Sequence, residues 1–233
     1  MKITEAIVLA GGLGTRLRSA VPDLPKCMAP VAGKPFLWYV INYYQKQGIS
    51  RFIFSLGYKH EIIEGYLEKE FPQLEYTVVV EEQPLGTGGA IQLAAKAAYT
   101  NDVLVLNGDT LFQIDLLEIA ALHEKAKADA TLSLKPMKDF DRYGAVSIDG
   151  NFRIVAFKEK QYYEEGLING GVYLINIPRL LEQALPEKFS FEKEYYEAFY
   201  KVLNFTGAIQ NGYFIDIGIP SDFEKAQIEL PNL

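Results

Sequence analysis

The stretch AGGLGTRL at residues 10–17 follows the short apolar run AIVL at residues 6–9. The apolar run predicts a buried strand that is bounded by turn residues. The three glycines of the stretch allow a tight turn and a close approach of the backbone to a ligand, because they carry no Cβ. Successive backbone N–H groups in such a loop can form an anion-binding concavity, and Arg16 adds a fork of donors suited to phosphate oxygens. The loop therefore predicts a polyphosphate site.

Two familiar phosphate-binding motifs are excluded. The dinucleotide fingerprint G-x-G-x-x-G requires a third glycine where this chain has Leu17, and the Gly-Lys-Ser/Thr of the Walker A loop is absent from the sequence. An ordinary glycine turn after a strand remains the alternative. The next segment favours a binding role, because residues 11–34 hold one acid and four cationic residues: Arg16, Arg18, Lys26 and Lys34. On a chain of net charge −7, a basic loop indicates a small anion as ligand and not nucleic acid.

The composition is that of an ordinary globular protein. Of the 233 residues, 49% are hydrophobic and 23% are charged, which favours one domain. No segment approaches the ~20 apolar residues of a membrane span, so no membrane partner is expected. The N-terminus lacks the pattern of a signal peptide, and a single cysteine excludes an intrachain disulfide. These features together favour a reducing cytoplasm.

The hydrophobic periodicity predicts an α/β fold with a mostly parallel sheet. We expect strands at residues 6–9, 51–56, 76–80, 102–106 and 130–135. Helices are expected between them at residues 36–47, 61–71, 87–99 and 115–127. After residue 136 the pattern changes to short strands at 144–148, 152–157 and 171–175, and to a hairpin of 206–210 with 213–217 around Asn211-Gly212. Further helices are expected at 179–184, 192–202 and from 221 to about 228.

The glycine loop followed by LPK at residues 24–26 resembles the signature of the sugar-1-phosphate nucleotidyltransferases. Four further segments resemble the D-glycero-α-D-manno-heptose 1-phosphate guanylyltransferases within that family: EEQPLGTGGA at 81–90, LNGDT at 106–110, INGGVY at 168–173 and FIDIGIP at 214–220. The resemblance covers essentially the whole chain. It implies the nucleotide-diphospho-sugar transferase fold, which is a Rossmann-like mixed, mostly parallel sheet with helices on both faces and a small β-rich sugar-binding part.

The resemblance also implies a reaction and a set of site residues. GMP would pass from GTP to a sugar 1-phosphate, giving a GDP-sugar and pyrophosphate with the help of Mg²⁺. Arg16 and Lys26 would be catalytic, and Asp109 and Asp216 would bind the metal. The nucleotide would contact Leu9, Ala10, Gly11, Gly12, Gly14, Thr15, Glu81, Gly86, Asn107 and Gly108. The sugar phosphate would contact Tyr143, Gly144, Glu159, Lys160, Asn169 and Gly170. We expect one domain, with a nucleotide-binding half at residues 1–135 and a sugar-binding half at 136–233.

The residue types agree with this chemistry, although each has a simpler explanation. Asp109 and Asp216 follow strands and offer the oxygen ligands that Mg²⁺ prefers, but either could be a turn or N-cap residue. Glu81 can accept both donors on the Watson–Crick edge of guanine, but it could also be an ordinary acidic residue at a strand end. A sugar phosphate is largely dianionic at neutral pH, so no general base is required. We accordingly expect His60 and His123 to be solvated helix residues.

Three alternatives to heptose 1-phosphate guanylyl transfer stay open. The acceptor could be mannose 1-phosphate, or the enzyme could transfer a uridylyl or thymidylyl group to a hexose or amino-sugar phosphate. The chain could also be a catalytically idle regulatory subunit that binds nucleotide sugars. Cys27 stands where relatives commonly carry proline, which predicts a thiol near the site and sensitivity to alkylation. Exposed aromatic side chains at Tyr195, Tyr196 and Tyr200 would leave room for a homodimer interface.

Overall fold

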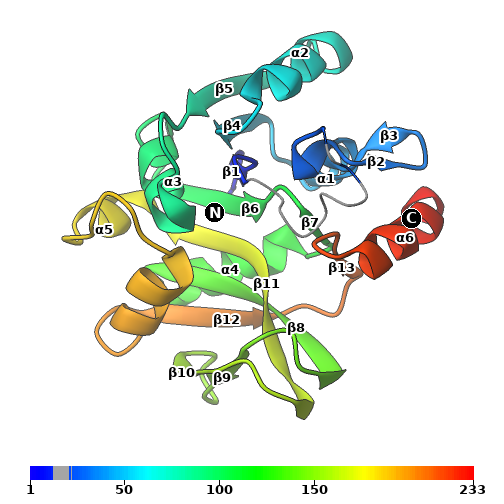
Figure 1. The fold of residues 1–233 in the computed structure, drawn as a ribbon. Helices are drawn as coiled ribbons and strands as arrows, with labels where there is room; N and C mark the ends of the chain where they lie inside the picture. Colours follow the sequence, from blue (N-terminus) through cyan, green and yellow to red (C-terminus); the bar gives the residue numbers. More distant parts are fainter. Residues whose placement is uncertain (13–20, 22) are drawn as a thin grey trace.

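The computed structural model describes residues 1–12, 21 and 23–233, and within them a nine-stranded mixed sheet forms the centre (Figure 1). The strands are β1 (Glu5–Leu9), β2 (Pro30–Val31), β3 (Lys34–Pro35), β4 (Arg51–Leu56), β5 (Glu75–Val80), β6 (Asp102–Asn107), β7 (Thr110–Phe112), β8 (Ala130–Phe140), β9 (Ala145–Ile148), β10 (Ile154–Lys158), β11 (Tyr163–Asn176), β12 (Phe205–Ile209) and β13 (Phe214–Asp216). The α-helices are α1 (Phe36–Lys46), α2 (His60–Glu70), α3 (Gly86–Ala95), α4 (Leu116–Ala126), α5 (Ile177–Leu181) and α6 (Pro220–Glu229). Shorter helical turns are η2 (Lys26–Met28), η3 (Phe191–Glu197) and η4 (Leu230–Asn232). None of the helices in the described part of the chain has the length and apolar character that crossing a bilayer requires.

The first part of the sheet is parallel, in the order β6-β1-β4-β5. Its strands are apolar on both sides because helices cover both faces. In β1, Ala6 and Val8 belong to the core cluster that α1, α2 and α4 complete, whereas Ile7 belongs to the cluster on the α3 side. Strand side chains alternate between faces, so one short strand anchors both cores. The open carboxyl ends of these strands lie at one edge of the sheet, where α/β proteins bind ligands.

The second part of the sheet is largely antiparallel and is built around the long strand β11. This strand pairs antiparallel with β6, β8 and β9, and β10 extends the sheet beyond β9. The predicted α/β class is therefore confirmed, with a parallel first part and a β-rich second part. Figure 1 shows the far ends of β8 and β11 extending away from the parallel strands, toward the region below α6.

The predicted hairpin at residues 206–217 is wrong. β12 pairs parallel with β8, and β13 pairs antiparallel with β7. The Asn211-Gly212 dipeptide instead passes close to other strands, since a Cβ on Gly212 would lie 1.9 Å from the Gln113 carbonyl oxygen. Lys135 Nζ donates to the carbonyl oxygens of both residues at 2.9 and 2.8 Å. The dipeptide matches a hairpin turn locally, but each flanking strand finds a better partner far away in the sequence.

The helix expected at residues 192–202 begins as a π-helix, η3. Phe191, Tyr195 and Tyr196 are fully buried in the core cluster on the α3 side. A π-turn is wider than an α-turn, which helps two adjacent tyrosines face the same core. The proposed interface of exposed aromatics is therefore corrected: Tyr195 and Tyr196 are core residues, and Tyr200 is only half-buried.

His123 also departs from its expected exposure, because it is 3% exposed inside α4. Its Nδ1 forms a 2.8 Å hydrogen bond with Thr131 Oγ1, which bonds in turn to Thr206 Oγ1 at 2.8 Å. Its Nε2 lies 3.4 Å from Asp102 Oδ1, an oxygen that also accepts from Asn176 Nδ2. The histidine thus ties α4 to three strands and serves the fold.

We expect the Asp102 carboxylate to make stability depend on pH. The hydrogen bond from His123, supported by the one from Asn176, holds the pKa of Asp102 below its usual value. A lowered folded-state pKa adds stability that is complete above the unfolded pKa of about 4 and is lost as the pH falls through the folded pKa. Asp102→Ala should lower the free energy of unfolding by about 1.5–3 kcal/mol at pH 7. Urea unfolding from pH 7 to pH 3 checks this, with Glu224→Ala as an exposed control; a difference from wild type that did not shrink below about pH 4 would contradict it.

Candidate active site

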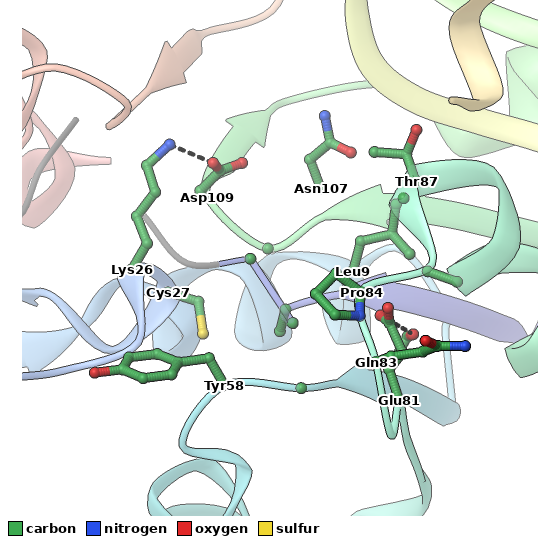
Figure 2. Close-up of a pocket in the computed structure, with 18 of the residues that line it drawn as sticks. Leu9, Lys26, Cys27, Tyr58, Glu81, Gln83, Pro84, Thr87, Asn107 and Asp109 are labelled. Carbon is green, nitrogen blue, oxygen red and sulfur yellow. Dashed lines mark hydrogen bonds and ion pairs between the residues drawn. The ribbon is translucent and has the colours of Figure 1, made fainter. Parts of the chain in front are cut away.

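A cavity of about 820 Å³ lies at the carboxyl ends of the four parallel strands (Figure 2). Each strand contributes residues at or just beyond its end: 10–12 after β1, 57–58 after β4, 81–84 after β5 and 107–109 at the end of β6. The cavity has two ends. Figure 2 shows Lys26 and Asp109 at one end and Glu81, Gln83 and Pro84 at the other. A long, two-ended ligand such as a nucleoside triphosphate matches this shape.

The described residues of the predicted nucleotide site meet at this cavity. Its lining includes Leu9, Ala10, Gly11, Gly12, Glu81, Gly86, Asn107 and Gly108. Gly14 and Thr15, together with the predicted catalytic Arg16, lie outside the described residues. The strand ends, which are scattered over a hundred positions of sequence, thus converge as the parallel topology requires.

Two glycines allow close packing at the strand ends. A Cβ on Gly108 would lie 2.8 Å from the Leu9 carbonyl oxygen, which accepts a 2.9 Å hydrogen bond from the Gly108 N–H. A Cβ on Gly11 would lie 3.0 Å from Glu81 Oε1 and 3.1 Å from the Gly57 nitrogen. These glycines bring the loops after β1 and β6 together and leave the Glu81 carboxylate beside the first loop.

Glu81 is held in place by its own loop and by the end of β4. Its N–H donates to the Leu56 carbonyl at 2.8 Å, and its Oε2 accepts the Leu85 N–H at 2.9 Å. Ser55 Oγ donates to Oε1 over 3.5 Å. A carboxylate has about four acceptor sites, so these contacts fix the group and leave capacity for two further donors. The geometry matches a carboxylate that is oriented before a ligand binds.

Gly86 lines the cavity, but its main constraint lies on the opposite side. Its φ of +73° is in the left-handed region, and a Cβ there would lie 2.5 Å from the Phe189 carbonyl oxygen. The same carbonyl accepts the Gly88 N–H at 2.9 Å. The glycine-rich start of α3 is therefore explained by packing against the segment before η3, and the expected close approach of Gly86 to a base is not needed to account for it.

Lys26 joins the two predicted metal-binding aspartates. Its ammonium forms an ion pair with Asp109 and lies 3.5 Å from Asp216 Oδ1. The antiparallel pairing of β13 with β7 sets Asp216 opposite Thr110, which brings the two aspartates together although they are far apart in sequence. Asp216 Oδ1 also accepts the Gly218 N–H at 2.7 Å. The lysine side chain is 11% exposed, so the three charges form a compact, partly buried cluster.

The cluster matches the donor set of a magnesium ion that is shared with a substrate. Mg²⁺ takes oxygen ligands and is commonly held by one or two protein carboxylates plus substrate phosphates. In the described part of the chain no group of three or more His, Cys, Asp or Glu side chains could hold a metal by itself. Asp109 and Asp216 supply two convergent carboxylates, and substrate phosphates would complete the oxygen shell that Mg²⁺ takes.

The expected reactivity of Cys27 is corrected by its surroundings. The residue lines the cavity, but it is 2% exposed. Burial, reinforced by the negative charge of Asp109, raises the pKa of the Cys27 thiol to about 12. The thiolate is the reactive form, so the thiol near the site is protected.

We therefore expect Cys27 to react slowly with iodoacetamide in the native protein. At pH 8 a thiol of pKa about 12 carries ~10⁻⁴ of its population as thiolate, so labelling should be about 10³-fold slower than in the urea-unfolded chain. Mass spectrometry of timed samples measures both rates. Native labelling within tenfold of the unfolded rate would contradict the buried position, and protection by GTP would then be the next comparison.

The predicted sugar-phosphate residues are not gathered in the large cavity. Tyr143 lines a second, smaller cavity of about 240 Å³ that Asp216 also borders. Gly144 packs against the Lys158 carbonyl oxygen, and Gly170 packs against the Phe112 ring. Glu159 and Lys160 are exposed beyond the end of β10. Of the six predicted sugar-phosphate residues, Tyr143 is the one that lines the second cavity together with Asp216 in the described chain.

Asn169 takes part in a chain of hydrogen bonds between the two halves. Its Nδ2 donates to the Tyr173 hydroxyl at 2.9 Å, and that hydroxyl donates to Glu192 Oε1 at 3.3 Å. Glu192 Oε2 accepts from the Thr87 hydroxyl at 3.0 Å. Thr87 lines the nucleotide cavity, so this chain links the cavity to the strand that carries Asn169.

Sequence reasoning missed several residues of the large cavity. They are Ser55, Gly57, Tyr58, Glu82, Gln83, Pro84, Thr87, Ala90 and Gly218. The strand-end rule that selected Gly11, Asn107 and Glu81 applies equally to the segment after β4, so it could have predicted Gly57 and Tyr58. Gly218 carries no such signal, because its position depends on the pairing of β13 with β7.

Comparisons with known proteins show the family of this chain. The family model "Nucleotidyl transferase" matches residues 5–232. The chain belongs to this family. The nucleotidyltransferase is 51% identical to the D-glycero-alpha-D-manno-heptose 1-phosphate guanylyltransferase of Aneurinibacillus thermoaerophilus. The alignment spans 226 residues, which are 97% of this chain and 98% of the relative. It is 46% identical to the enzyme of the same name from Campylobacter jejuni, with 94% and 96% coverage.

A solved structure supports the same relationship. The nucleotidyltransferase resembles HddC from Yersinia pseudotuberculosis complexed with GMP-PN, with a TM-score of 0.86 and 36% sequence identity. The alignment covers 97% of this chain and 98% of that one. The predicted family and fold are therefore confirmed across nearly the whole length.

Proposed function

We propose that this nucleotidyltransferase transfers GMP from GTP to D-glycero-α-D-manno-heptose 1-phosphate, giving GDP-heptose and pyrophosphate. The carrying observation is the match to two heptose 1-phosphate guanylyltransferases at 51% and 46% identity over nearly the full length of each. The two-ended cavity at the strand ends is consistent with a nucleoside triphosphate, with the base near Glu81 and the phosphates near Lys26. A reaction that consumes GTP also fits the cytoplasmic location that the sequence features predict.

The chemical step is an in-line attack of the sugar phosphate on the α-phosphorus of GTP. One phosphate oxygen of the acceptor forms the new P–O bond while the bond to pyrophosphate breaks. The acceptor phosphate is largely dianionic at neutral pH, so it attacks without a general base. Catalysis then consists of holding two anions in line and neutralising their charge. The position of Lys26 supports this proposed role, because its ammonium reaches the end of the cavity where Asp109 lies.

Asp109 and Asp216 would hold Mg²⁺ together with the phosphates of the substrates. The ion, when bound, supplies Lewis-acid charge neutralisation on the phosphate oxygens. In the structure Lys26 balances both carboxylates. We assign to the Lys26 ammonium the contact with the α-phosphate and with the incoming sugar phosphate, because it lies at the aspartates that would hold the ion. The proposed role of Arg16, to hold the triphosphate, rests on the glycine-loop motif.

The two halves of the chain would divide the substrates between them. Apart from Gly218, the nucleotide cavity is lined by residues 9–109, whereas the second cavity is lined by residues 137–225. We assign residues 1–135 to the nucleotide and residues 136–233 to the acceptor. Tyr143, Gly144, Glu159, Lys160, Asn169 and Gly170 remain the proposed acceptor residues.

Pyrophosphate release tests the function. Initial rates with Mg²⁺ are measured for GTP, UTP, dTTP, CTP and ATP, each paired with heptose 1-phosphate, mannose 1-phosphate and glucose 1-phosphate. The proposal predicts the highest kcat/KM for GTP with heptose 1-phosphate. A preference for UTP or dTTP would replace the guanine assignment by the pyrimidine alternative. If folded protein that binds GTP released no pyrophosphate with any pair of nucleotide and acceptor, an idle binding subunit would be favoured.

A further inference from the structure

The second cavity, of about 240 Å³, lies beside the proposed reaction centre. The end of β8, the turn after it, strand β13 and helix α6 form its wall, and Asp216 borders it while also contacting Lys26. We propose that this cavity is the subsite for the exocyclic polyol of the acceptor sugar and that Arg142, Asp222 and Lys225 determine the preference for a heptose over a hexose. The inference rests on the proposed guanylyl transfer, because it concerns the acceptor of that reaction.

The position of the cavity relates it to the acceptor and separates it from the nucleotide. It shares Tyr143 with the proposed acceptor residues and Asp216 with the proposed metal site. Asp216 therefore connects this cavity to the residues that are proposed to hold the acceptor phosphate. The second cavity has less than a third of the 820 Å³ volume of the nucleotide cavity. This volume suits a few carbon and oxygen atoms and not a second nucleoside.

The charges on the wall favour a neutral, hydroxyl-bearing group. Three cationic and four acidic side chains line the cavity: Lys138, Arg142, Lys225, Asp139, Asp141, Asp216 and Asp222. A second phosphate would meet more negative than positive charge there. Vicinal hydroxyls each need one acceptor and one donor, and carboxylates beside ammonium and guanidinium groups supply both.

The strongest feature is the ion pair of Arg142 Nη1 with Asp222 Oδ2, at 2.6 Å. It joins the turn after β8 to the first turn of α6, and both side chains are partly exposed at the cavity. The paired groups hold each other in place, so a hydroxyl that bonds to both meets an oriented donor and acceptor. A manno-heptose has the ring of mannose plus one further hydroxyl-bearing carbon, which is the group that such a pair would recognise. Sites built to bond a hydroxyl discriminate strongly against a substrate that lacks it.

The test compares two acceptors in the full-length enzyme. With saturating GTP and Mg²⁺, kcat/KM is measured for heptose 1-phosphate and for mannose 1-phosphate in wild type, Asp222→Ala, Lys225→Met and Glu224→Gln. The ratio of kcat/KM for heptose 1-phosphate to kcat/KM for mannose 1-phosphate should fall about 10-fold in Asp222→Ala and about 3-fold in Lys225→Met. The main cause should be a higher KM for the heptose. Glu224 lies on the same helix but outside the cavity, so Glu224→Gln should keep the wild-type ratio within twofold. Lys225→Met alters an exposed side chain and carries the test if Asp222→Ala fails to fold.

The outcomes separate this inference from the proposed function. Wild-type activity on both acceptors with no preference for the heptose would overturn the subsite and leave guanylyl transfer standing. An equal loss on both acceptors in Asp222→Ala, or an unchanged ratio, would also overturn it, because the cavity would then serve only the fold or the reaction centre. A wild-type enzyme that uses neither acceptor with GTP would overturn both the function and the subsite.

Discussion

Replacing Lys26 by methionine is expected to lower kcat for pyrophosphate release about 10²–10³-fold, which is the cost of removing one preorganised charge donor from a transition state. Methionine keeps much of the length of the side chain but removes the ammonium. The positive charge reaches Asp109 and Asp216 across a partly buried site, where water screens it poorly. The loss should appear mainly in kcat, because the proposed contact strengthens as the α-phosphate and the acceptor phosphate approach each other.

Steady-state kinetics with GTP and heptose 1-phosphate measure this effect, and thermal unfolding shows whether the variant is folded. Lys34→Met is the matched control: Lys34 is a cation in the same basic segment, lies 3.9 Å from Glu70, and has no part in the cavity wall of the described chain. It should retain kcat within about twofold. A folded Lys26→Met enzyme with kcat within threefold of wild type would restrict Lys26 to a structural ion pair.

Replacing Glu81 by glutamine is expected to lower kcat/KM for GTP about 10²-fold and to reduce the preference for GTP over UTP by a similar factor. Glutamine can still accept the Leu85 N–H, so the loop that holds residue 81 should persist. Its amide presents a donor to guanine where the carboxylate presented an acceptor, and a buried donor facing a donor is costly. The fall should be larger for GTP than for UTP, since uracil lacks the paired donors of guanine.

The measurement is kcat/KM for both nucleotides in wild type, Glu81→Gln and Glu68→Gln. Glu68 is an exposed residue of α2 and controls for the loss of one negative charge. An equal fall for GTP and UTP in Glu81→Gln would mean that Glu81 supports the loop without reading the base.

The strand-end loops were predictable because their signals are local. Short apolar runs mark buried parallel strands, and the rule that ligands bind at carboxyl ends assigns Gly11, Glu81 and Asn107 to one edge without any knowledge of their distance. The sequence could not show why Gly86 is glycine, since the reason is the carbonyl of Phe189, a hundred positions away. Asp109 and Asp216 could be paired only through the family resemblance, because β7 and β13 are three residues each and carry no pairing signal.

The errors arise where distant contacts override a local preference. Asn211-Gly212 is a strong hairpin signal, yet β8 offers β12 a parallel partner and β7 offers β13 an antiparallel one. His123 sits on a helix face that a sequence pattern assigns to water, but Asp102 and Thr131 supply the partners that make its burial favourable. Hydrophobic periodicity counts only apolar positions, so it does not predict that a polar residue with buried partners will itself be buried.

Product analysis under competition tests the central claim most directly. The enzyme is given heptose 1-phosphate, Mg²⁺ and equal concentrations of GTP, UTP, dTTP, CTP and ATP, and the nucleotide sugars formed are identified by mass spectrometry. The account predicts GDP-heptose as the dominant product, with one pyrophosphate released for each molecule formed. A dominant UDP- or dTDP-heptose, or no nucleotide sugar from folded enzyme, would contradict it.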